Sequence, residues 1–446
     1  PNGMKPIADY VHGLGMKAGL YTDAGNSTCG SMWDNDAAGV GAGIYGHEPQ
    51  DAQLYFGDWG FDFIKIDYCG GDALGLNEKE RYTSIRNSID KVNKDVSINI
   101  CRWAFPGTWA KDAATSWRIS GDINAHWGSL RYVVGKNLYL SAYAGNGHYN
   151  DMDMMVIGFR NDSKVGGQGL TPTEEEAHFG LWCIMSSPLL IGCNLENMPD
   201  SSLKLLTNKE LIALNQDPLG LQAYVAQHEN EGYVLVKDIE QKRGNVRAVA
   251  LYNPSDTICS FSVPFSSLEF GGNVKVRDLV KHSDLGNFSG TFEQTLPAHS
   301  AMFLRIEGET RLEPTLYEAE WAYLPLFNDL GKNPKGIIYA HDKEASGKMK
   351  VGFLGGQPEN YAEWREVYSE NGGRYDMTIH YLYGKGRQIE LDVNGIITKI
   401  DSLGKDNGHN QITVPVELKA GYNTIRMGNS YNWAPDIDCF TLTKAL

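Results

Sequence analysis

Lys65 and Asp67 lie two positions apart within the short apolar run FIKIDYC at residues 63–69. Successive side chains of a β-strand point to opposite faces, so this spacing directs both charged groups to the same side. A run of this kind is typical of a buried parallel strand, where an unpaired charge shifts its pKa or destabilises the fold. The two residues are therefore a structural ion pair or a helix cap, or they belong to a catalytic centre. The polar residues of neighbouring segments favour the catalytic centre.

Polar or aromatic residues also lie at the ends of other expected strands. In a barrel of alternating strands and helices these ends form one rim, where barrel enzymes place their active sites. Two carboxylates with a base, an arginine and a tryptophan suit glycoside hydrolysis, in which one carboxylate attacks the sugar and the other transfers a proton. A magnesium site is the competing use, but Lys65 would repel the metal. The residues concerned are Asp23, Lys65, Asp67, Cys101, Trp103, Arg118, Asp122, Asp151 and Asp153.

Residues 1 to about 220 alternate between helical and strand patterns. This alternation predicts a parallel sheet, and the repeated polar strand ends favour a (β/α)8 barrel of the TIM type. A doubly wound open sheet is the alternative, but no GxGxxG motif or phosphate-binding loop follows a strand. Helices are expected over 4–14, 48–58, 78–93, 108–115 and 173–185, and strands over 17–23, 61–67, 96–103, 117–122, 148–151 and 187–192.

Beyond residue 220 the pattern changes to short alternating strands separated by turn signals such as Gly372-Gly373 and Asn394-Gly395. The first strands, over 232–237, 247–252, 274–279 and 301–306, predict an antiparallel β domain. The polar segment 307–311 is interpreted as a linker. The expected organisation is a catalytic barrel at 1–220, an antiparallel β domain at 221–308 and a β-sandwich at 313–446.

Composition excludes several classes of function. A net charge of −15 and a pI near 5.2 argue against a nucleic-acid partner, which requires a basic surface. No apolar run of 18 residues is present, so no membrane span is expected. The seven cysteines leave at least one unpaired and form no zinc-binding pattern. The chain starts in a helical pattern without a signal peptide, so we expect this sequence to begin in the middle of a domain.

Five ordered segments resemble the motifs of glycoside hydrolase family 27, the α-galactosidase family. The resemblance implies a retaining exo-glycosidase that removes terminal α-D-galactosyl residues from oligosaccharides or polysaccharides. β-L-arabinopyranosidase and α-N-acetylgalactosaminidase activities are alternatives within the family, and a catalytically inactive glycan-binding protein is an alternative of another class. The segments are VHGLGMKAGLYTDAG (11–25), KIDYC (65–69), WRISGDI (117–123), NDMDM (150–154) and NQDPLG (215–220).

Transferred to this chain, the resemblance implies that Asp67 is the nucleophile and Asp122 the general acid/base. Asp67 must stay ionised, which the Lys65 cation favours, whereas Asp122 must hold a proton and so needs partial desolvation. Cys29 and Cys69 match the family's disulfide beside the nucleophile, and catalysis needs no cofactor. The expected substrate-binding residues are Asp23, Lys65, Cys101, Trp103, Arg118, Asp151 and Met154.

The chain departs from the family pattern in two ways. Family members begin several tens of residues earlier, with strands whose paired aspartates bind the far hydroxyls of the sugar and distinguish galactose from L-arabinopyranose. Arg102 stands where α-galactosidases usually carry a glutamate near the 2-hydroxyl, while Phe105 matches a bulky residue that disfavours an N-acetyl group. We therefore rank α-galactosidase first, β-L-arabinopyranosidase second and α-N-acetylgalactosaminidase third.

The last unit resembles carbohydrate-binding modules of families 35 and 6, through the motifs YEAE (317–320), GRY (373–375) and NWAPDID (432–438). Such β-sandwiches hold a structural calcium through early glutamates and a late aspartate, here Glu318, Glu320 and Asp438. Asn432 and Trp433 are the expected sugar-binding residues. An immunoglobulin-like interaction domain is the alternative. The substrate class and the expected disulfide indicate a secreted or periplasmic protein, and the sequence indicates no oligomeric state.

Overall fold

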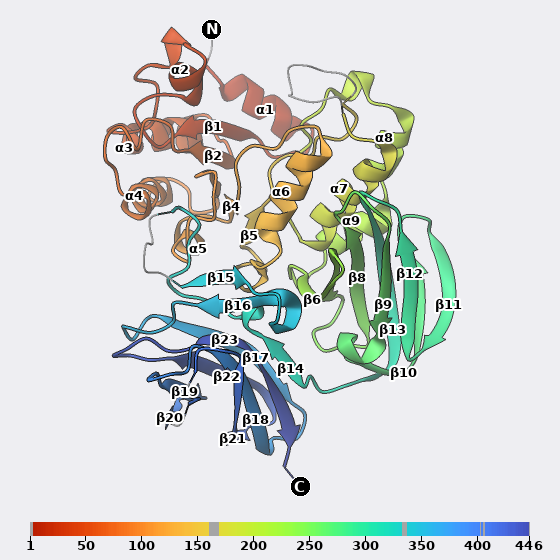
Figure 1. The fold of residues 1–446 in the computed structure, drawn as a ribbon. Helices are drawn as coiled ribbons and strands as arrows, with labels where there is room; N and C mark the ends of the chain where they lie inside the picture. Colours follow the sequence, from red (N-terminus) through yellow and green to blue (C-terminus); the bar gives the residue numbers. More distant parts are fainter. Residues whose placement is uncertain (1–2, 160–168, 332–336, 402, 405, 446) are drawn as a thin grey trace. The chain divides into compact units, whose positions relative to one another are not determined.

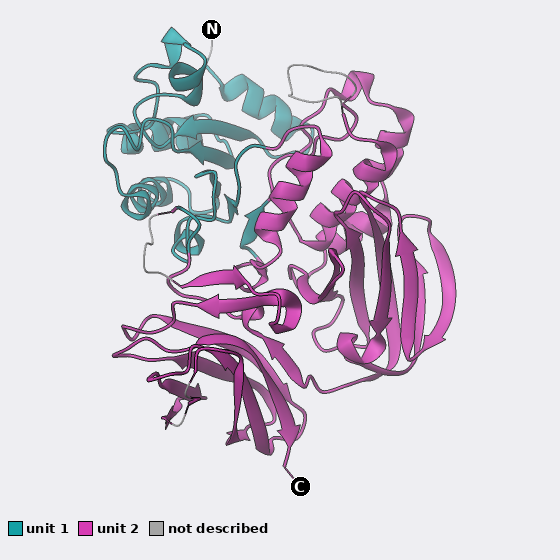
Figure 2. Ribbon diagram, in the orientation of Figure 1, with its two compact units in different colours: residues 1–122, 147–151, 328–330 teal, residues 123–146, 152–327, 331–446 magenta. Residues whose placement is uncertain are grey.

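The computed structural model describes residues 3–159, 169–331, 337–401, 403–404 and 406–445 (Figure 1). The chain forms two compact units, which are considered separately. Unit 1 comprises residues 1–122, 147–151 and 328–330, and unit 2 comprises 123–146, 152–327 and 331–446 (Figure 2).

Unit 1 is built on a parallel sheet whose strand order follows the chain, β1-β2-β3-β4-β5. Each neighbouring pair is parallel, which confirms the predicted parallel α/β sheet. Ile64 and Ile66 of β2 are fully buried, as the apolar run predicted. The strands are β1 (Gly19–Asp23), β2 (Phe63–Asp67), β3 (Ser97–Ile100), β4 (Ser116–Arg118) and β5 (Tyr149–Asp151).

Helix α1 of unit 1 precedes β1 and the other helices lie between successive strands, largely where the periodicity predicts them. The expected helix over 48–58 changes at Gln53 into a π-helical turn (Gln53–Asp58), and the one over 108–115 shortens to four residues. α4 begins where Asn77 accepts a hydrogen bond from the backbone of Glu80. The helices are α1 (Lys5–Gly13), α2 (Cys29–Trp33), α3 (Glu48–Ala52), α4 (Glu78–Asp90) and α5 (Ala110–Ala113).

Unit 2 begins with helices and continues as β structure. α7 starts with a capping box, in which the side chain of Thr171 accepts from the backbone N–H of Glu174 and the side chain of Glu174 accepts from that of Thr171. Pro172 is the first residue of the helix. The strand expected over 187–192 is reduced to one isolated parallel bridge, between Met155 and Ile191. The helices are α6 (Trp127–Asn137), α7 (Pro172–Ile184), α8 (Asp200–Leu206) and α9 (Lys209–Asn215).

An antiparallel β domain follows, with a six-stranded sheet in the order β11-β10-β13-β8-β7-β6 and a two-stranded sheet β12-β9. The predicted linker over 307–311 is wrong, because β13 continues through it and Arg311 pairs in register with Phe270. Ion pairs of Arg311 with Asp238 and Glu269 hold this polar segment in the sheet. The strands are β6 (Tyr224–Glu229), β7 (Gly232–Asp238), β8 (Val246–Asn253), β9 (Cys259–Pro264), β10 (Phe270–Asp278), β11 (Ser283–Ser289), β12 (Thr291–Leu296) and β13 (Ser300–Arg311).

The remaining strands form a sandwich of two antiparallel sheets around one apolar core (teal to blue in Figure 1). One sheet has the order β15-β16-β23-β18-β21, with β14 added on β23, and the other has the order β17-β22-β19-β20. The Asn394-Gly395 turn joins β19 to β20 as predicted. The strands are β14 (Leu316–Glu318), β15 (Ile338–His341), β16 (Met349–Gly352), β17 (Tyr361–Ser369), β18 (Gly373–Leu382), β19 (Ile389–Val393), β20 (Ile396–Ile400), β21 (Asn410–Leu418), β22 (Gly421–Gly428) and β23 (Asp436–Lys444).

Candidate functional site

The carboxyl ends of the parallel strands in unit 1 gather the polar residues that the sequence singled out. The strand register places Asp23 beside Asp67 and Arg118 beside Asp151. All four side chains are buried. Because parallel strands end at the same edge of a sheet, four segments that are distant in the sequence contribute to one polar cluster.

Asp67 is held by two hydrogen-bond donors at the end of β2. The Tyr21 hydroxyl donates to Oδ2 at 3.0 Å, and the Tyr68 backbone N–H donates to Oδ1 at 3.1 Å. Burial, followed by the charge of Asp67, raises the pKa of Tyr21 well above its usual range, so the hydroxyl keeps its proton. The Lys65 Nζ lies 5.9 Å from the centre of the Tyr21 ring. The sequence analysis missed Tyr21, although it lies two positions before Asp23 and hence on the same face.

Arg118 connects β4 to the segment that carries Asp122. Its Nη2 lies 3.1 Å from Asp122 Oδ1 and donates to the Ser120 carbonyl at 3.2 Å, while Nη1 approaches Cys101 Sγ at 3.9 Å. The expected desolvation of Asp122 is not present in unit 1, because its side chain is 74% exposed. Its carboxyl group therefore lies at a solvent-facing rim, paired with a buried guanidinium.

Asp151 takes its orientation from a residue of β3 that the sequence analysis missed. The Asn99 amide donates to Asp151 Oδ2 at 2.8 Å and to the Ser116 hydroxyl at 2.8 Å. Asn99 lies in the middle of an apolar strand and pairs in register with Lys65. An amide at this position satisfies polar groups of both β4 and β5 without adding a charge.

Trp103 follows β3 with a positive φ of 57°, an uncommon backbone conformation for a residue other than glycine. Its neighbour Arg102 is held by acids, with Nη2 2.9 Å and 3.1 Å from the two oxygens of Asp72 and Nε 3.2 Å from Glu78. The guanidinium also lies over the rings of Tyr68 and Trp103, at 4.7 Å and 5.6 Å. The guanidinium of Arg102 is therefore held by contacts within unit 1. Phe105, the expected bulky residue, is buried in unit 1.

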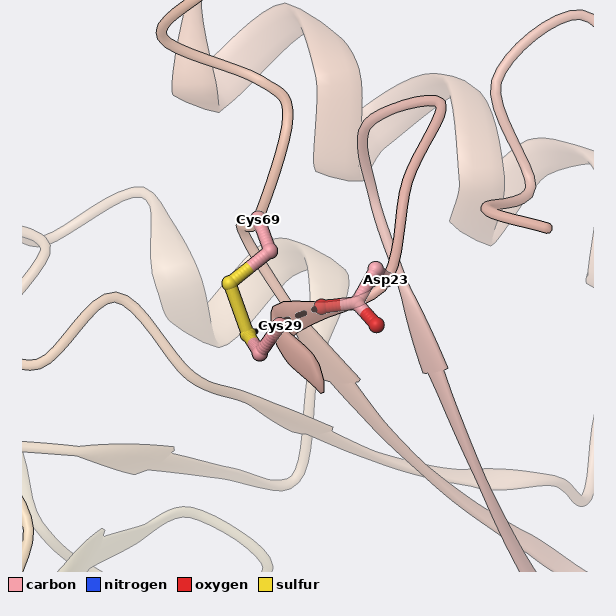
Figure 3. Close-up of side chains that lie close together, drawn as sticks. All are labelled: Asp23, Cys29 and Cys69. Carbon is pink, nitrogen blue, oxygen red and sulfur yellow. Dashed lines mark hydrogen bonds between the residues drawn. A yellow bond between two sulfur atoms is a disulfide. The ribbon is translucent and has the colours of Figure 1, made fainter. Parts of the chain in front are cut away.

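A disulfide links Cys29 to Cys69, as the resemblance implied, with 5.1 Å between the Cα atoms. Figure 3 shows Asp23 beside it, with Oδ1 3.2 Å from Cys29 Sγ. A disulfide sulfur carries no hydrogen, so this contact is a hydrogen bond only when Asp23 holds the proton. The bridge fixes the loop after β1 to the residues directly after Asp67.

Residues 1–217 match the family model described as Alpha galactosidase A, and residues 232–306 match the Alpha galactosidase C-terminal beta sandwich domain. The chain is 34% identical over 330 residues to Alpha-galactosidase A from Cellvibrio japonicus, with 69% of this chain and 76% of that protein covered. The chain belongs to the α-galactosidase family.

Two further similarities show how much of the α-galactosidase family pattern the chain shares. It is 37% identical over 304 residues to Alpha-galactosidase 3 from Arabidopsis thaliana, which covers 67% of this chain but only 65% of that relative. The solved structure of a family 27 β-L-arabinopyranosidase from Geobacillus stearothermophilus is 25% identical, with a TM-score of 0.59 over 69% of this chain and 78% of that chain. The family fold alone therefore does not distinguish the two sugars.

Removal of the disulfide should destabilise unit 1 of this α-galactosidase family member. The bridge closes a sequence separation of 40 residues, and the loss of such a restraint on the unfolded chain costs about 4 kcal/mol. Urea unfolding of the Cys29→Ser, Cys69→Ser double variant should show a correspondingly lower midpoint. Cys193→Ser, at a half-buried cysteine outside the bridge, is the matched control. An unchanged midpoint in the double variant would contradict this role.

Asp23 should make the stability depend on pH. Burial, followed by the charge of Asp67, raises the pKa of Asp23 to about 7, from an ordinary value of about 4. Between these values the folded chain holds a proton that the unfolded chain releases, so stability should fall as the pH rises through this window. Denaturation midpoints measured from pH 4.5 to 7.5 should decline less steeply for Asp23→Asn than for wild type. Parallel curves for both proteins, with exposed Asp9→Asn as the control, would refute the prediction.

Unit 2 carries a second candidate site, formed by three buried carboxylates of the C-terminal β-sandwich. Glu318 and Glu320 lie near the start of its sequence, and Asp438 lies near the end. One oxygen of Glu318 and one of Asp438 lie within 4.8 Å of each other and of Cys439 Sγ. Both oxygens of Glu320 and Oε2 of Glu318 have no hydrogen-bond partner among the described residues. Ser346 donates from its hydroxyl to Glu318 at 2.5 Å and from its backbone to Asp438 at 2.9 Å.

The electrostatics of this cluster favour a bound cation. Burial, together with the charge of Asp438, raises the pKa of Glu318 to about 7. Burial and the charge of Glu318 raise the pKa of Glu320. Burial raises the pKa of Asp438 to about 6. The described residues place no lysine or arginine within ion-pairing distance of these three groups. Oxygen ligands and uncompensated negative charge suit a hard divalent ion such as calcium. Burial raises the pKa of the Cys439 thiol, so this soft group stays protonated.

The predicted sugar-binding residues of the sandwich lie at its surface. Tyr431, Asn432 and Trp433 are exposed, and Trp433 forms an edge contact with exposed Phe353, with 6.3 Å between the ring centres. The sequence analysis missed Phe353, which is brought to Trp433 by the bridge between Gly355 and Trp433. Met154, the remaining expected sugar contact, packs against Gly192 in unit 2.

Proposed function

We propose that the chain is the catalytic part of a retaining α-galactosidase that releases terminal α-D-galactosyl residues from oligosaccharides or polysaccharides. The observation that carries this proposal is the buried Asp67 carboxylate at the end of β2, with Lys65 two residues away and two donors fixing its orientation. Membership of the α-galactosidase family supports it. In this proposal the parallel sheet belongs to a (β/α)8 barrel at 1–220, followed by the β domain at 221–308 and the sandwich at 313–446.

The proposed reaction is a double displacement with Asp67 as nucleophile. Asp67 attacks the anomeric carbon while the bond to the leaving oxygen breaks, and that oxygen takes the proton of Asp122. Asp122 then removes a proton from water, whose oxygen attacks the same carbon and releases Asp67. Since Asp122 is exposed in unit 1, a bound sugar would have to supply part of the desolvation that keeps it protonated.

The other strand-end residues would bind and orient the sugar. Lys65, Arg118 and Asp151 carry donors and acceptors suited to sugar hydroxyls, and the flat face of Trp103 suits the apolar side of the ring. Asp23 and Cys101 would line the pocket. Tyr21 would act through Asp67, because its hydroxyl already donates to that carboxylate.

A comparison of two nitrophenyl glycosides tests the substrate. The full-length protein should hydrolyse the α-D-galactopyranoside faster than the β-L-arabinopyranoside. A faster rate on the arabinoside would leave the proposed mechanism unchanged but would identify the protein as a β-L-arabinopyranosidase. The similarity to the Geobacillus enzyme supports this second alternative. Wild-type turnover no greater than that of Asp67→Asn on either substrate would instead support an inactive glycan-binding protein. Activity on the N-acetylgalactosaminide would favour the third alternative.

For the C-terminal sandwich we propose a carbohydrate-binding module with a structural calcium. Glu318 and Asp438, whose oxygens lie within 4.8 Å of each other, would hold the ion together with the unpartnered Glu320. The bound ion would offset their charge and tie the start of the module to its end. Trp433 and Phe353 would form the sugar platform, with Asn432 as a hydrogen-bonding group. Trp433→Ala should lose binding to the substrate polysaccharide in a pull-down, while Tyr422→Ala, at an exposed aromatic elsewhere on the module, should retain it.

We also propose that the protein acts outside the cytoplasm, in a secreted or periplasmic location. The Cys29–Cys69 disulfide supports this, because such bridges persist mainly in oxidising compartments. None of the helices in the described residues is both long enough and apolar enough to span a membrane.

A further inference from the structure

Two short turns beside the carboxylate cluster of the sandwich also contact strand β6 of the preceding β domain. The first turn, Ala319–Trp321, contains Glu320. Its Trp321 indole donates to the Val225 carbonyl at 2.7 Å, and the Trp321 and Tyr224 ring centres lie 4.7 Å apart. β6 is an edge strand of its sheet, so the first turn satisfies a backbone group that would otherwise be exposed.

The second turn, Ser346–Lys348, reaches β6 through a histidine. His228 Nδ1 lies 3.3 Å from the Gly347 carbonyl, and a carbonyl only accepts, so this nitrogen donates. The His228 ring stacks on Tyr233 at 4.1 Å, which fixes its orientation. Ser346, on the same turn, donates to both Glu318 and Asp438. One turn thus links the carboxylates to β6.

Gly347 lies between these two contacts. It has a φ of +56°, and a side chain there would start 2.4 Å from Glu320 Oε1 and would collide with it. Glu320 is 1% exposed, and both of its oxygens lack a hydrogen-bond partner among the described residues. A buried, unpartnered carboxylate aimed at this turn calls for a cation, and an ion held there would pull Glu320 and the second turn together.

We propose that a divalent cation held by Glu318, Glu320 and Asp438 fixes both turns against β6, so that metal binding and docking of the sandwich on the β domain are coupled. This inference rests on the calcium proposed above. Without the ion the buried carboxyl groups have no partner that holds them together, so the two turns are less restrained. With the ion both turns keep the geometry in which Trp321 and Gly347 reach β6. Because coupling is reciprocal, disruption of the β6 contact must also lower the affinity of the site for the ion.

The rest of the junction limits how far it can open. A cavity of about 260 Å³ lies beside these contacts and is lined by Tyr224 and Trp321 among others, so packing there is incomplete. The same cavity is also lined by Lys242, which pairs with Glu366, and by Arg243, which lies over Tyr368 at 4.3 Å. Loss of the ion is therefore expected to free β6 locally rather than to separate the two domains.

Hydrogen exchange of the full-length protein tests the coupling. In EGTA, the amides of β6 should exchange at least about fivefold faster than in calcium chloride, while those of central strand β8 should not change. The comparison uses wild type and so does not depend on a variant that folds. Glu320→Gln should bring β6 to the fast rate in both buffers, and Asp438→Asn serves the same purpose if Glu320→Gln does not fold.

The reciprocal experiment is a calorimetric calcium titration of His228→Phe. This variant keeps a ring against Tyr233 but loses the donor to Gly347, so its calcium affinity should fall by about fivefold. His282→Phe, at an exposed histidine of the same β domain, should bind like wild type. Calcium binding with unchanged β6 exchange and unchanged His228→Phe affinity would overturn the coupling alone. Absence of calcium binding to wild type would refute the proposed metal as well.

Discussion

Asp67→Asn is expected to lower kcat on the nitrophenyl α-galactoside by on the order of 10⁴-fold or more. The amide has nearly the size of the carboxylate. Its oxygen can still accept from the Tyr68 backbone N–H, and its NH2 group can donate to the Tyr21 hydroxyl, so the fold should remain. It has no negative charge with which to attack the anomeric carbon, so the covalent intermediate cannot form. Steady-state rates of both proteins, with circular dichroism as a check of folding, measure the effect.

The identity of the nucleophile can be tested independently by chemical rescue. In Asp67→Gly, sodium azide can enter the space left by the carboxylate and attack the α-galactoside directly. One displacement inverts the anomeric centre, so the product should be the β-galactosyl azide, identified by NMR. Asp58→Asn, at an exposed carboxylate before β2, should keep wild-type activity. A galactosyl azide of α configuration, or an active Asp67→Asn enzyme, would remove Asp67 from this role.

Asp122→Ala should lose activity in proportion to the need of the leaving group for a proton. With melibiose, whose leaving oxygen is a poor leaving group, kcat/KM should fall by about 10²- to 10⁴-fold. With 2,4-dinitrophenyl α-galactoside, which departs without protonation, the fall should be less than about tenfold. The Arg118 partner of Asp122 remains in place in this variant. The ratio of the two losses is therefore the measured quantity.

Azide again supplies a second readout for Asp122. It should accelerate the second step of Asp122→Ala by attacking the galactosyl-enzyme, and two inversions should give the α-galactosyl azide. Asp112→Asn, on the short helix α5, is the matched control and should behave like wild type. Equal losses on melibiose and on the dinitrophenyl galactoside would contradict a role in proton transfer.

Much of the architecture follows from the local sequence. The alternating helical and strand patterns predicted the parallel sheet, because periods of 3.6 and 2 are properties of each segment alone. The turn chemistry after residue 220 predicted the antiparallel strands in the same way. The segment around 307–311 was misassigned because its polar residues resemble a linker. Only the folded β domain shows that Arg311 forms ion pairs with Asp238 and Glu269, which keep this segment in the strand.

For the candidate site, the sequence determined which residues meet at the strand ends, and the tertiary structure decided what each of them contacts. Motif and spacing brought Asp67, Arg118 and Cys29 into the site. The motifs did not identify Tyr21 or Asn99 as the donors to Asp67 and Asp151, because these bonds join different strands.

The same limit applies to the partners of Arg102, to the exposure of Asp122 and to the contacts of the carboxylate cluster with β6. The local chain fixes the direction of a side chain. Its partners and its solvation depend on segments that only folding brings together.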